Sequence, residues 1–318
     1  MTQFIAYNGD ADGLCALQQL RLAEPGPVTL VTGVKRDIKL LERVRAGSGD
    51  QVTVLDISLD SNRAALLRLL DAGASVRYFD HHHAGEIPLA AILTANIDTA
   101  ATVCTSILVD RYLHGRFQLW AVAAAFGDNL PAIGKAMGQA AGLNAGQLET
   151  LEGLGVCLNY NAYGDSIADL HFDPALLAEQ MLPYTDPLEF AGRSPAFSRL
   201  ASGYAEDMEK ARHLPPLRQT AATHLVLMPD EAWARRAIGV LANELVQRLD
   251  NKALAILSPN ARGGYTVSIR VPANHGTGAD EFCRKFDTGG GRRTAGGINL
   301  LPKEEVDIFC ARFEAAFA

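Results

Sequence analysis

Acidic residues and histidines cluster at three places in the first half of the chain. The segment NGDADG, residues 8–13, holds two aspartates, Asp56 follows later, and the run DHHH occupies residues 80–83. Carboxylates that lie close together repel one another and are tolerated mainly when a cation neutralises them. Oxygen-rich ligation with one or two imidazoles suits a divalent ion such as Mn²⁺ or Mg²⁺ better than a structural zinc.

Each of these places stands at the end of an apolar, β-branched segment. Such segments alternate with helical patterns, which predicts right-handed βαβ units and a parallel sheet. The carboxyl ends of parallel strands share one edge, where ligands bind, so we expect the acidic residues and His81 to meet there. The predicted strands are residues 3–7, 28–32, 51–55 and 75–79, and the predicted helices are residues 14–22, 37–45 and 61–70.

The remainder of the chain predicts a second, smaller α/β domain. The pattern is mostly helical from about residue 102 to residue 182, and prolines then accumulate. Ser194 and Pro195 form a good helix start. We therefore expect an N-terminal parallel-sheet α/β domain, a linker helix and a C-terminal α/β domain, at residues 1–190, 191–215 and 216–318. The C-terminal strands are expected at residues 223–228, 253–258 and 265–271, and the helices at residues 233–249 and 302–316.

Composition narrows the classes of partner. The 318 residues carry a net charge of −7, which is unsuited to gripping long duplexes through a broad basic face. Five cysteines, an odd number without a CxxC pair, indicate reduced thiols. The longest apolar stretch, residues 119–126, is too short to span a bilayer, and the N-terminus carries no secretory pattern. We expect a cytoplasmic protein with no membrane partner.

Four motifs resemble, in order and approximate spacing, those of the DHH phosphoesterases. They are DADG at residues 10–13, Asp56, DHH at residues 80–82 and GDN at residues 127–129. That family includes RecJ-type exonucleases, nanoRNase/pAp-phosphatases, cyclic-dinucleotide phosphodiesterases and family II pyrophosphatases. The resemblance implies a DHH catalytic domain with a dinuclear metal centre.

Two later motifs resemble the DHH-associated domain of the same family. Residues 268–270 (SIR) are similar to its SxR signature, and residues 289–297 (GGGRRTAGG) to its GGGHxxAAG signature. The resemblance thus covers nearly the whole chain and implies that the C-terminal domain binds substrate. The substrate-binding residues that it implies are Arg270, Gly289, Gly290, Gly291, Arg292 and Arg293. Arg292 stands where the family usually has histidine.

The resemblance also implies a set of metal ligands. Asp10 would help to hold a first ion and Asp12 a second. Asp56 would bridge the two ions, while His81 and Asp128 would complete the second site. Two ions so placed activate a water molecule and stabilise the attacking and leaving oxygens at phosphorus.

Three further residues carry expected roles. Asp80 would orient the adjacent histidine and His82 would face the substrate, so Asp56, Asp80 and His82 are the catalytic candidates. Asn8 would be a ligand of the first ion, at a position where many relatives have His or Asp. A neutral amide is a weaker ligand, so the first ion is expected to bind loosely or only together with substrate.

These observations favour hydrolysis of phosphodiester or terminal phosphate bonds in short oligonucleotides or small nucleotides, with two divalent ions, Mn²⁺ or else Mg²⁺. One alternative is a cyclic nucleotide or cyclic dinucleotide phosphodiesterase. Another is a nucleotide-binding regulatory protein with an impaired metal centre, which Asn8 and Arg292 suggest. The sequence leaves a homodimer open.

Overall fold

The computed structural model describes residues 1–249 and 251–318, which form two compact units. The first unit contains Met1–Ala162 and Ser166–Ser202, and the second contains Tyr163–Asp165 and Gly203–Ala318. Helix α9, Pro195–Arg212, belongs to both units, and Ser194 Oγ accepts a hydrogen bond from the Ala196 N–H at its start. The limits at residues 190 and 216 stay a prediction.

The first unit is built on a five-stranded parallel sheet in the order β2-β1-β3-β4-β5. All four pairings are parallel, which confirms the predicted α/β class. Strand β5 was not predicted, because its sequence, LTANI, is short and half polar. The strands are β1 Gln3–Tyr7, β2 Thr29–Val31, β3 Gln51–Leu55, β4 Ser75–Asp80 and β5 Leu93–Ile97.

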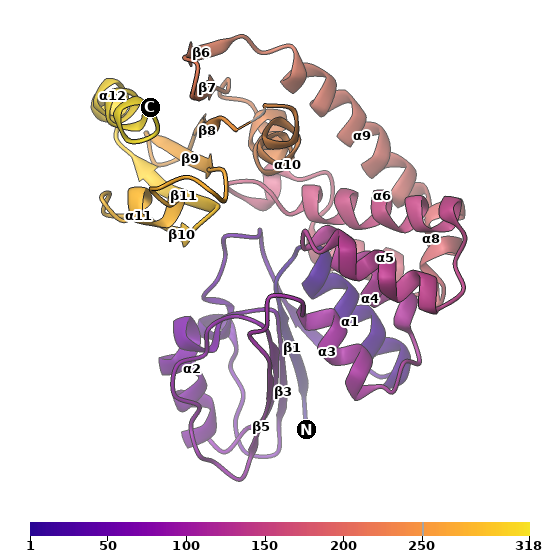
Figure 1. Ribbon diagram of the computed structural model, residues 1–318. Helices are drawn as coiled ribbons and strands as arrows, with labels where there is room; N and C mark the ends of the chain where they lie inside the picture. Colours follow the sequence, from indigo (N-terminus) through magenta and orange to yellow (C-terminus); the bar gives the residue numbers. More distant parts are fainter. Residues whose placement is uncertain (250) are drawn as a thin grey trace. The chain divides into compact units, whose positions relative to one another are not determined.

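Helices cover both faces of this sheet (Figure 1). Helix α2 packs on one face through an apolar cluster that includes Val54, Leu66 and Tyr78, and α1 lies on the opposite face with α3 and α4. The helices are α1 Ala11–Ala23, α2 Leu59–Asp71, α3 Thr105–Tyr112, α4 Gln118–Gly127, α5 Pro131–Ala140, α6 Ala145–Asn161, α7 Pro174–Met181 and α8 Pro187–Arg193, with a 3₁₀ turn η2 at Ile167–Asp169.

The helix predicted at residues 37–45 is wrong. The segment contains only a 3₁₀ turn, η1, at Leu40–Arg43. Its backbone groups bond to a side chain of α2 instead: the Leu41 N–H donates to Asn62 Oδ1 at 3.3 Å, and Asn62 Nδ2 donates to the Ile38 carbonyl at 2.6 Å. A buried amide therefore replaces the helical hydrogen bonds that the charge pattern indicated.

The second unit contains a six-stranded mixed sheet in the order β10-β11-β9-β8-β7-β6. Within this second sheet, only the β7–β8 pairing is parallel among the strands that the structure describes. The glycine-rich segment Gly289–Arg292 forms strand β10 at one edge of that sheet, a strand that the sequence did not predict. The strands are β6 Pro216–Gln219, β7 Thr223–Leu227, β8 Ala253–Pro259, β9 Tyr265–Arg270, β10 and β11 Ala295–Leu301.

Two apolar clusters hold this second sheet. Helix α10, Ala232–Arg248, packs on one face together with the end of α9. The other face meets an aromatic cluster of Phe282, Phe309, Phe313 and Phe317. Phe282 comes from α11, Ala279–Cys283. Phe309 and Phe313 come from α12, Val306–Ala316, and Phe317 directly follows that helix. A 3₁₀ turn, η3, at Lys303–Glu305 precedes α12.

Two expectations from composition can be compared with the structure. All five cysteines are buried free thiols, as predicted. Among the residues that the structure describes, every helix is too short or too polar to cross a membrane.

Candidate metal centre

Helix α1 begins directly after β1, and Asp10 caps its first turn. Asp10 Oδ1 accepts hydrogen bonds from the backbone N–H groups of Asp12 at 3.1 Å and Gly13 at 3.2 Å. Position 13 requires glycine, because a Cβ atom there would lie 2.0 Å from the Asn8 carbonyl oxygen. This tight turn brings both aspartates into the interior, where each is at most 3% exposed.

Asp12 is held by the N-terminus of α3. Its two carboxylate oxygens accept hydrogen bonds from the backbone N–H groups of Thr105 and Ser106, both at 2.7 Å. Ser106 Oγ donates to the Asp12 carbonyl at 2.8 Å. The first N–H groups of a helix have no intrahelical acceptor and favour negative charge. The start of α3 therefore fixes the Asp12 carboxylate in place.

Asp56 follows β3 in a left-handed backbone conformation, with φ at 59°. This conformation is costly for a residue with a side chain and persists where neighbours enforce it. Thr105 Oγ1 donates to Asp56 Oδ1 at 3.1 Å, and Tyr78 Oη donates to the Ile57 carbonyl at 2.6 Å. Burial, followed by the charges of Asp12 and other nearby carboxylates, raises the pKa of Asp56 well above its ordinary value.

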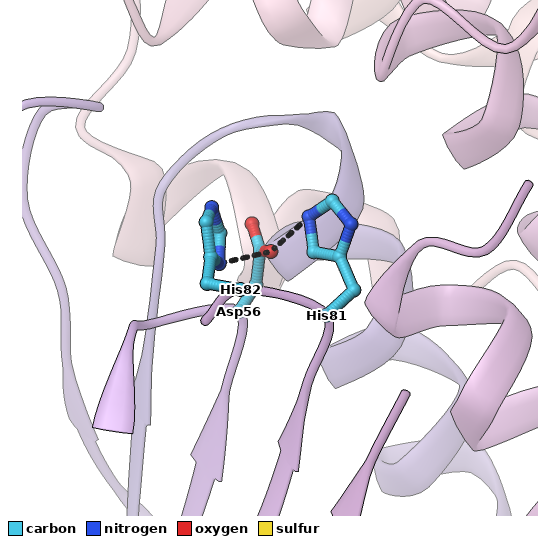
Figure 2. Close-up of side chains that lie close together, drawn as sticks. All are labelled: Asp56, His81 and His82. Carbon is cyan, nitrogen blue, oxygen red and sulfur yellow. Dashed lines mark ion pairs between the residues drawn. The ribbon is translucent and has the colours of Figure 1, made fainter. Parts of the chain in front are cut away.

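His81 faces three carboxylates through one nitrogen. Its Nδ1 lies 3.0 Å from the Val103 carbonyl oxygen, which can only accept, so Nδ1 donates this hydrogen bond and Nε2 is the nitrogen that faces the carboxylates. That Nε2 atom lies 3.4 Å from Asp56 Oδ1, 3.9 Å from Asp128 Oδ2 and 4.0 Å from Asp12 Oδ2. Figure 2 shows the imidazole directed at Asp56.

His82 approaches Asp56 from the other side (Figure 2). Its Nδ1 lies 2.7 Å from Asp80 Oδ1 and 3.9 Å from Asp56 Oδ1. Burial alone would lower the pKa of His82, but the hydrogen bond and the charge of Asp80 outweigh it and raise the pKa. The side chain is 39% exposed, so this histidine is accessible while Asp80 favours its protonated form.

Asp128 follows the last residue of α4. Close packing sets its position, because a Cβ atom on Gly127 would lie 2.4 Å from Ala11 Cβ and 2.7 Å from the Gly155 carbonyl oxygen. Burial, followed by the Asp12 charge, raises the pKa of Asp128 to about 6. A carboxyl in this state gains stability from any cation that enters the cluster.

Asn8 and Asp10 have different surroundings. Asn8 Oδ1 accepts the backbone N–H of Asp10 at 3.3 Å. Lys35 Nζ lies 2.5 Å from Asp10 Oδ2 and 2.9 Å from Asn159 Oδ1. Burial works to raise the pKa of Asp10, but the Lys35 ammonium and the capping hydrogen bonds outweigh it and hold the pKa below its ordinary value.

Within residues 1–249 and 251–318, two groups of side chains have the spacing of metal ligands. One contains Asp56, His81 and His82, and the other contains Asp12, His81 and Asp128. A divalent cation fits this cluster, because buried carboxylates that repel one another converge on one imidazole nitrogen. Asp10 belongs to neither group.

The substrate-binding candidates lie in the second unit. Strand pairing places Arg292 opposite Ala295, and Ala295 opposite Arg270, so the two arginines stand on strands that flank the same residue of β11. Arg270 donates to Asn243 Oδ1 from Nε at 3.1 Å and from Nη2 at 2.9 Å. Arg293 donates to the His275 carbonyl at 2.8 Å. Arg292 is exposed.

The glycines of β10 allow close strand packing. Gly291 has a φ of 144°, and a Cβ atom there would lie 2.5 Å from the Ala295 carbonyl oxygen. A Cβ atom on Gly289 would lie 1.8 Å from the Cys283 carbonyl oxygen, whereas Gly290 faces open space. At least Gly289 and Gly291 are therefore required by the fold itself, whatever they bind.

No protein-family model matches the chain, and no curated protein matches it. Solved structures do. Exonuclease RecJ bound to manganese matches with a TM-score of 0.66 and 16% identity, over 99% of this chain and 89% of that one. RecJ from Thermus thermophilus in complex with Mn²⁺ matches with a TM-score of 0.66 and 18% identity, over 99% of this chain and 51% of that one. The chain has the RecJ fold. It spans about half the length of the Thermus protein.

The RecJ fold also occurs in a smaller neighbour. The pGpG-specific phosphodiesterase PggH from Vibrio cholerae matches with a TM-score of 0.56 and 14% identity, over 99% of this chain and 100% of that one. RecJ-type exonucleases are among the enzymes that the motifs at residues 10–13, 80–82 and 127–129 resemble. The fold that the resemblance implies is therefore confirmed.

Sequence reasoning missed several residues that build the cluster. Thr105 and Ser106 hold Asp12 and Asp56, Val103 sets the proton of His81, and Lys35 pairs with Asp10. A Thr-Ser pair at the start of a helical stretch is a signal that could have been noticed. Lys35 gave none, since it stands in a charged segment with no periodicity.

Proposed function

We propose that the chain is a DHH-type, metal-dependent phosphoesterase that hydrolyses phosphodiester or terminal phosphate bonds in short oligonucleotides or small nucleotides. The single observation that carries this proposal is the convergence of Asp12, Asp56 and Asp128 on His81 Nε2. The RecJ fold supports it, since neighbours with that fold include an exonuclease bound to manganese and a pGpG-specific phosphodiesterase.

The metal ligands follow from the two groups of side chains. Asp12, Asp56, His81 and Asp128 would hold a divalent ion, Mn²⁺ in our proposal, and Asn8 with Asp10 marks the place of a further ion. When bound, divalent ions supply a Lewis acid for the phosphoryl oxygens and promote ionisation of a water molecule near neutral pH. No side-chain nucleophile is needed.

His82 is the proposed proton donor and phosphate contact. Its raised pKa keeps the imidazole protonated nearer to neutrality, and Asp80 fixes the ring through Nδ1. The opposite nitrogen, Nε2, then carries the second proton of the imidazolium. A positioned imidazolium stabilises negative charge on a phosphoryl oxygen and can deliver a proton to the leaving oxygen.

Arg270, Arg292 and Arg293 are the proposed phosphate contacts of the second unit, with Gly289–Gly291 beside them. A guanidinium binds phosphate through paired N–H groups, and an exposed residue such as Arg292 can adopt that geometry. Arg270 is already fixed by Asn243, which would hold its guanidinium ready for an anion.

A substrate panel tests the proposal. The purified chain is incubated with linear pGpG, cyclic di-GMP and 3′,5′-bisphosphoadenosine, each with Mn²⁺, Mg²⁺ or a chelator. We expect metal-dependent turnover of the linear dinucleotide or the bisphosphate. Turnover of the cyclic compound alone would favour a cyclic dinucleotide phosphodiesterase. Binding without hydrolysis under any metal would favour a regulatory protein and overturn the proposal.

A further inference from the structure

Lys35 reaches the metal cluster from the segment between β2 and η1. Its backbone N–H donates to the Ala162 carbonyl at 2.9 Å, which ties the segment to the end of α6. Its ammonium lies 2.9 Å from Asn159 Oδ1, also on α6, and 2.5 Å from Asp10 Oδ2. The Lys35 side chain is 28% exposed and the Asp10 side chain only 4%. A backbone contact and a side-chain contact thus both direct this cation at Asp10.

The ammonium occupies the place where a first divalent ion would bind. Of the two oxygens of Asp10, Oδ1 caps α1 and Oδ2 meets Lys35. Asn8, a further donor at this place, is a neutral amide whose oxygen accepts the Asp10 N–H. A divalent ion here would compete with a positive charge for the same carboxylate oxygen, and its other anionic ligand, Asp56, would be shared with the ion beside His81.

The other position has the opposite character. Asp12, Asp128 and Asp56 surround His81 Nε2 at 3.4–4.0 Å. The backbone N–H groups that hold Asp12 are neutral donors and leave the carboxylate its charge. Attraction for a cation is therefore concentrated on this side.

We propose that the Lys35 ammonium takes the place of the first divalent ion, so that the chain retains one resident ion, held by Asp12, Asp56, His81 and Asp128. This proposal rests on the proposed function for the metal site and specifies its stoichiometry. Lys35 acts as a fixed positive charge beside the remaining ion and is a positioning residue for Asp10. A single divalent ion and an ammonium would then provide three positive charges where two divalent ions provide four.

Manganese binding tests this directly. The full chain is stripped with chelator, titrated with Mn²⁺ alone, and followed by electron paramagnetic resonance and by metal analysis after desalting. We expect one retained ion per chain, with the spectrum of an isolated Mn²⁺. Lys35→Gln removes the charge and should raise the affinity for a second ion at least about fivefold. This is the effect of one unit charge a few ångströms away, even with water-like screening. The second ion should give an exchange-coupled spectrum.

Matched variants separate charge from structure. Lys35→Arg keeps the charge and should behave as the parent chain. Lys39→Gln removes an exposed charge from the same segment and should leave both ions unchanged. Asn8→His adds a ligand but keeps Lys35, so it should still retain one ion, whereas Asn8→His with Lys35→Gln should retain two.

Several results would overturn the proposal. They are two retained, coupled ions in the parent chain, a gain of less than fivefold in Lys35→Gln, or two ions in Asn8→His alone. The first of these needs no variant, so the test survives if Lys35→Gln fails to fold. Parallel assays with pGpG keep the two proposals distinct. One ion without hydrolysis of any nucleotide would defeat the proposed function only, and two coupled ions with hydrolysis would defeat only the role of Lys35.

Discussion

At the scale of a single residue, Asp56 is a buried carboxylate that faces other carboxylates. Its contribution to stability therefore depends on whether a cation is bound. Asp56→Asn keeps the shape and removes the charge. With chelator present, the variant should melt a few degrees above the parent chain, because it relieves repulsion in a buried cluster. With Mn²⁺ present, that order should reverse, and hydrolysis should fall at least about 100-fold because a ligand is lost.

The two measurements are melting temperatures with chelator and with Mn²⁺, and initial rates on the best nucleotide of the panel. Asp60→Asn, on the exposed start of α2, is the control and should change neither. Near-parental turnover in Asp56→Asn, or a lower melting temperature under both conditions, would contradict the role assigned to Asp56.

The sequence indicated the chemical types at this site but not the full contact set. Asp12, Asp56 and His81 could be grouped because parallel strands end at one sheet edge, whereas Asp128, which follows α4, was added only by the resemblance of its GDN motif to the family. The hydrogen bonds from Thr105 and Ser106 to Asp12 join residues more than 90 positions apart and have no local signature. Lys35 escaped prediction for the same reason, since only the tertiary fold brings it to Asp10.

At the scale of elements, the crossing of α4 and α6 determines where Asp128 stands. A Cβ atom on Gly155 would lie 2.1 Å from the Ala123 carbonyl oxygen and 2.8 Å from the Gly127 nitrogen. Gly155→Ala should therefore push α4 away and lower the free energy of unfolding by about 1–3 kcal/mol, the usual cost of overpacking. It should also weaken Mn²⁺ binding, because Asp128 directly follows α4.

Gly153 provides the control on the same helix. A Cβ atom there meets nothing within 4 Å, so Gly153→Ala should stabilise the chain by roughly 0.5–1 kcal/mol through helix propensity. Thermal melting and Mn²⁺ titration of both variants measure the contrast. Equal effects of the two substitutions would show that the crossing of α4 and α6 does not constrain Asp128.

The end of α9 is joined to α10 by an ion pair in the second unit. Arg212 donates to Glu244 from Nε at 2.9 Å and from Nη2 at 2.8 Å. The Arg212 hydrogen bond holds the pKa of Glu244 in the folded chain below its ordinary value. The ion pair therefore stabilises the fold fully above about pH 4.5, and this stabilisation disappears as the pH falls through the lower pKa of the folded state. Glu244→Gln should cost about 1 kcal/mol at pH 7.

That cost should shrink as the pH falls below about 4.5, because protonation removes the same charge in the parent chain. Melting curves of both proteins between pH 7 and pH 3.5 measure the difference, and Glu206→Gln on the exposed face of α9 is the control. A difference in melting temperature that stays constant across this range would exclude the ion pair as its cause.

Element prediction succeeded where local patterns decide the structure and failed where distant partners do. Strand β3 was predicted with its observed bounds, because QVTVL is a buried β-branched run. The 37–45 segment failed because Asn62 bonds to its backbone groups. The glycine run of β10 carries no strand propensity and is extended because it pairs with β11.

At the scale of the whole molecule, charge sets the length of nucleic acid that the chain can hold. The net charge is −7, and the proposed phosphate contacts are Arg270, Arg292 and Arg293. Each phosphate neutralised on a single strand contributes about −0.7 to the slope of log affinity against log salt. Three contacts therefore predict a slope no steeper than about −2 for a 20-nucleotide strand, and the two phosphates of pGpG limit its slope to about −1.4.

The measurement is the affinity for both substrates between 50 and 300 mM NaCl at constant Mn²⁺, about the range over which such slopes are resolved. A long strand adds phosphates beyond the three proposed cationic contacts on a chain of net charge −7, so extra length should add no further counterion release. Arg292→Gln should flatten the slope by about 0.7 for both substrates, which ties the salt effect to one named contact. If the slope for the 20-nucleotide strand were instead much steeper than that for pGpG, the chain would possess a longer basic track, and long single strands would be its substrates.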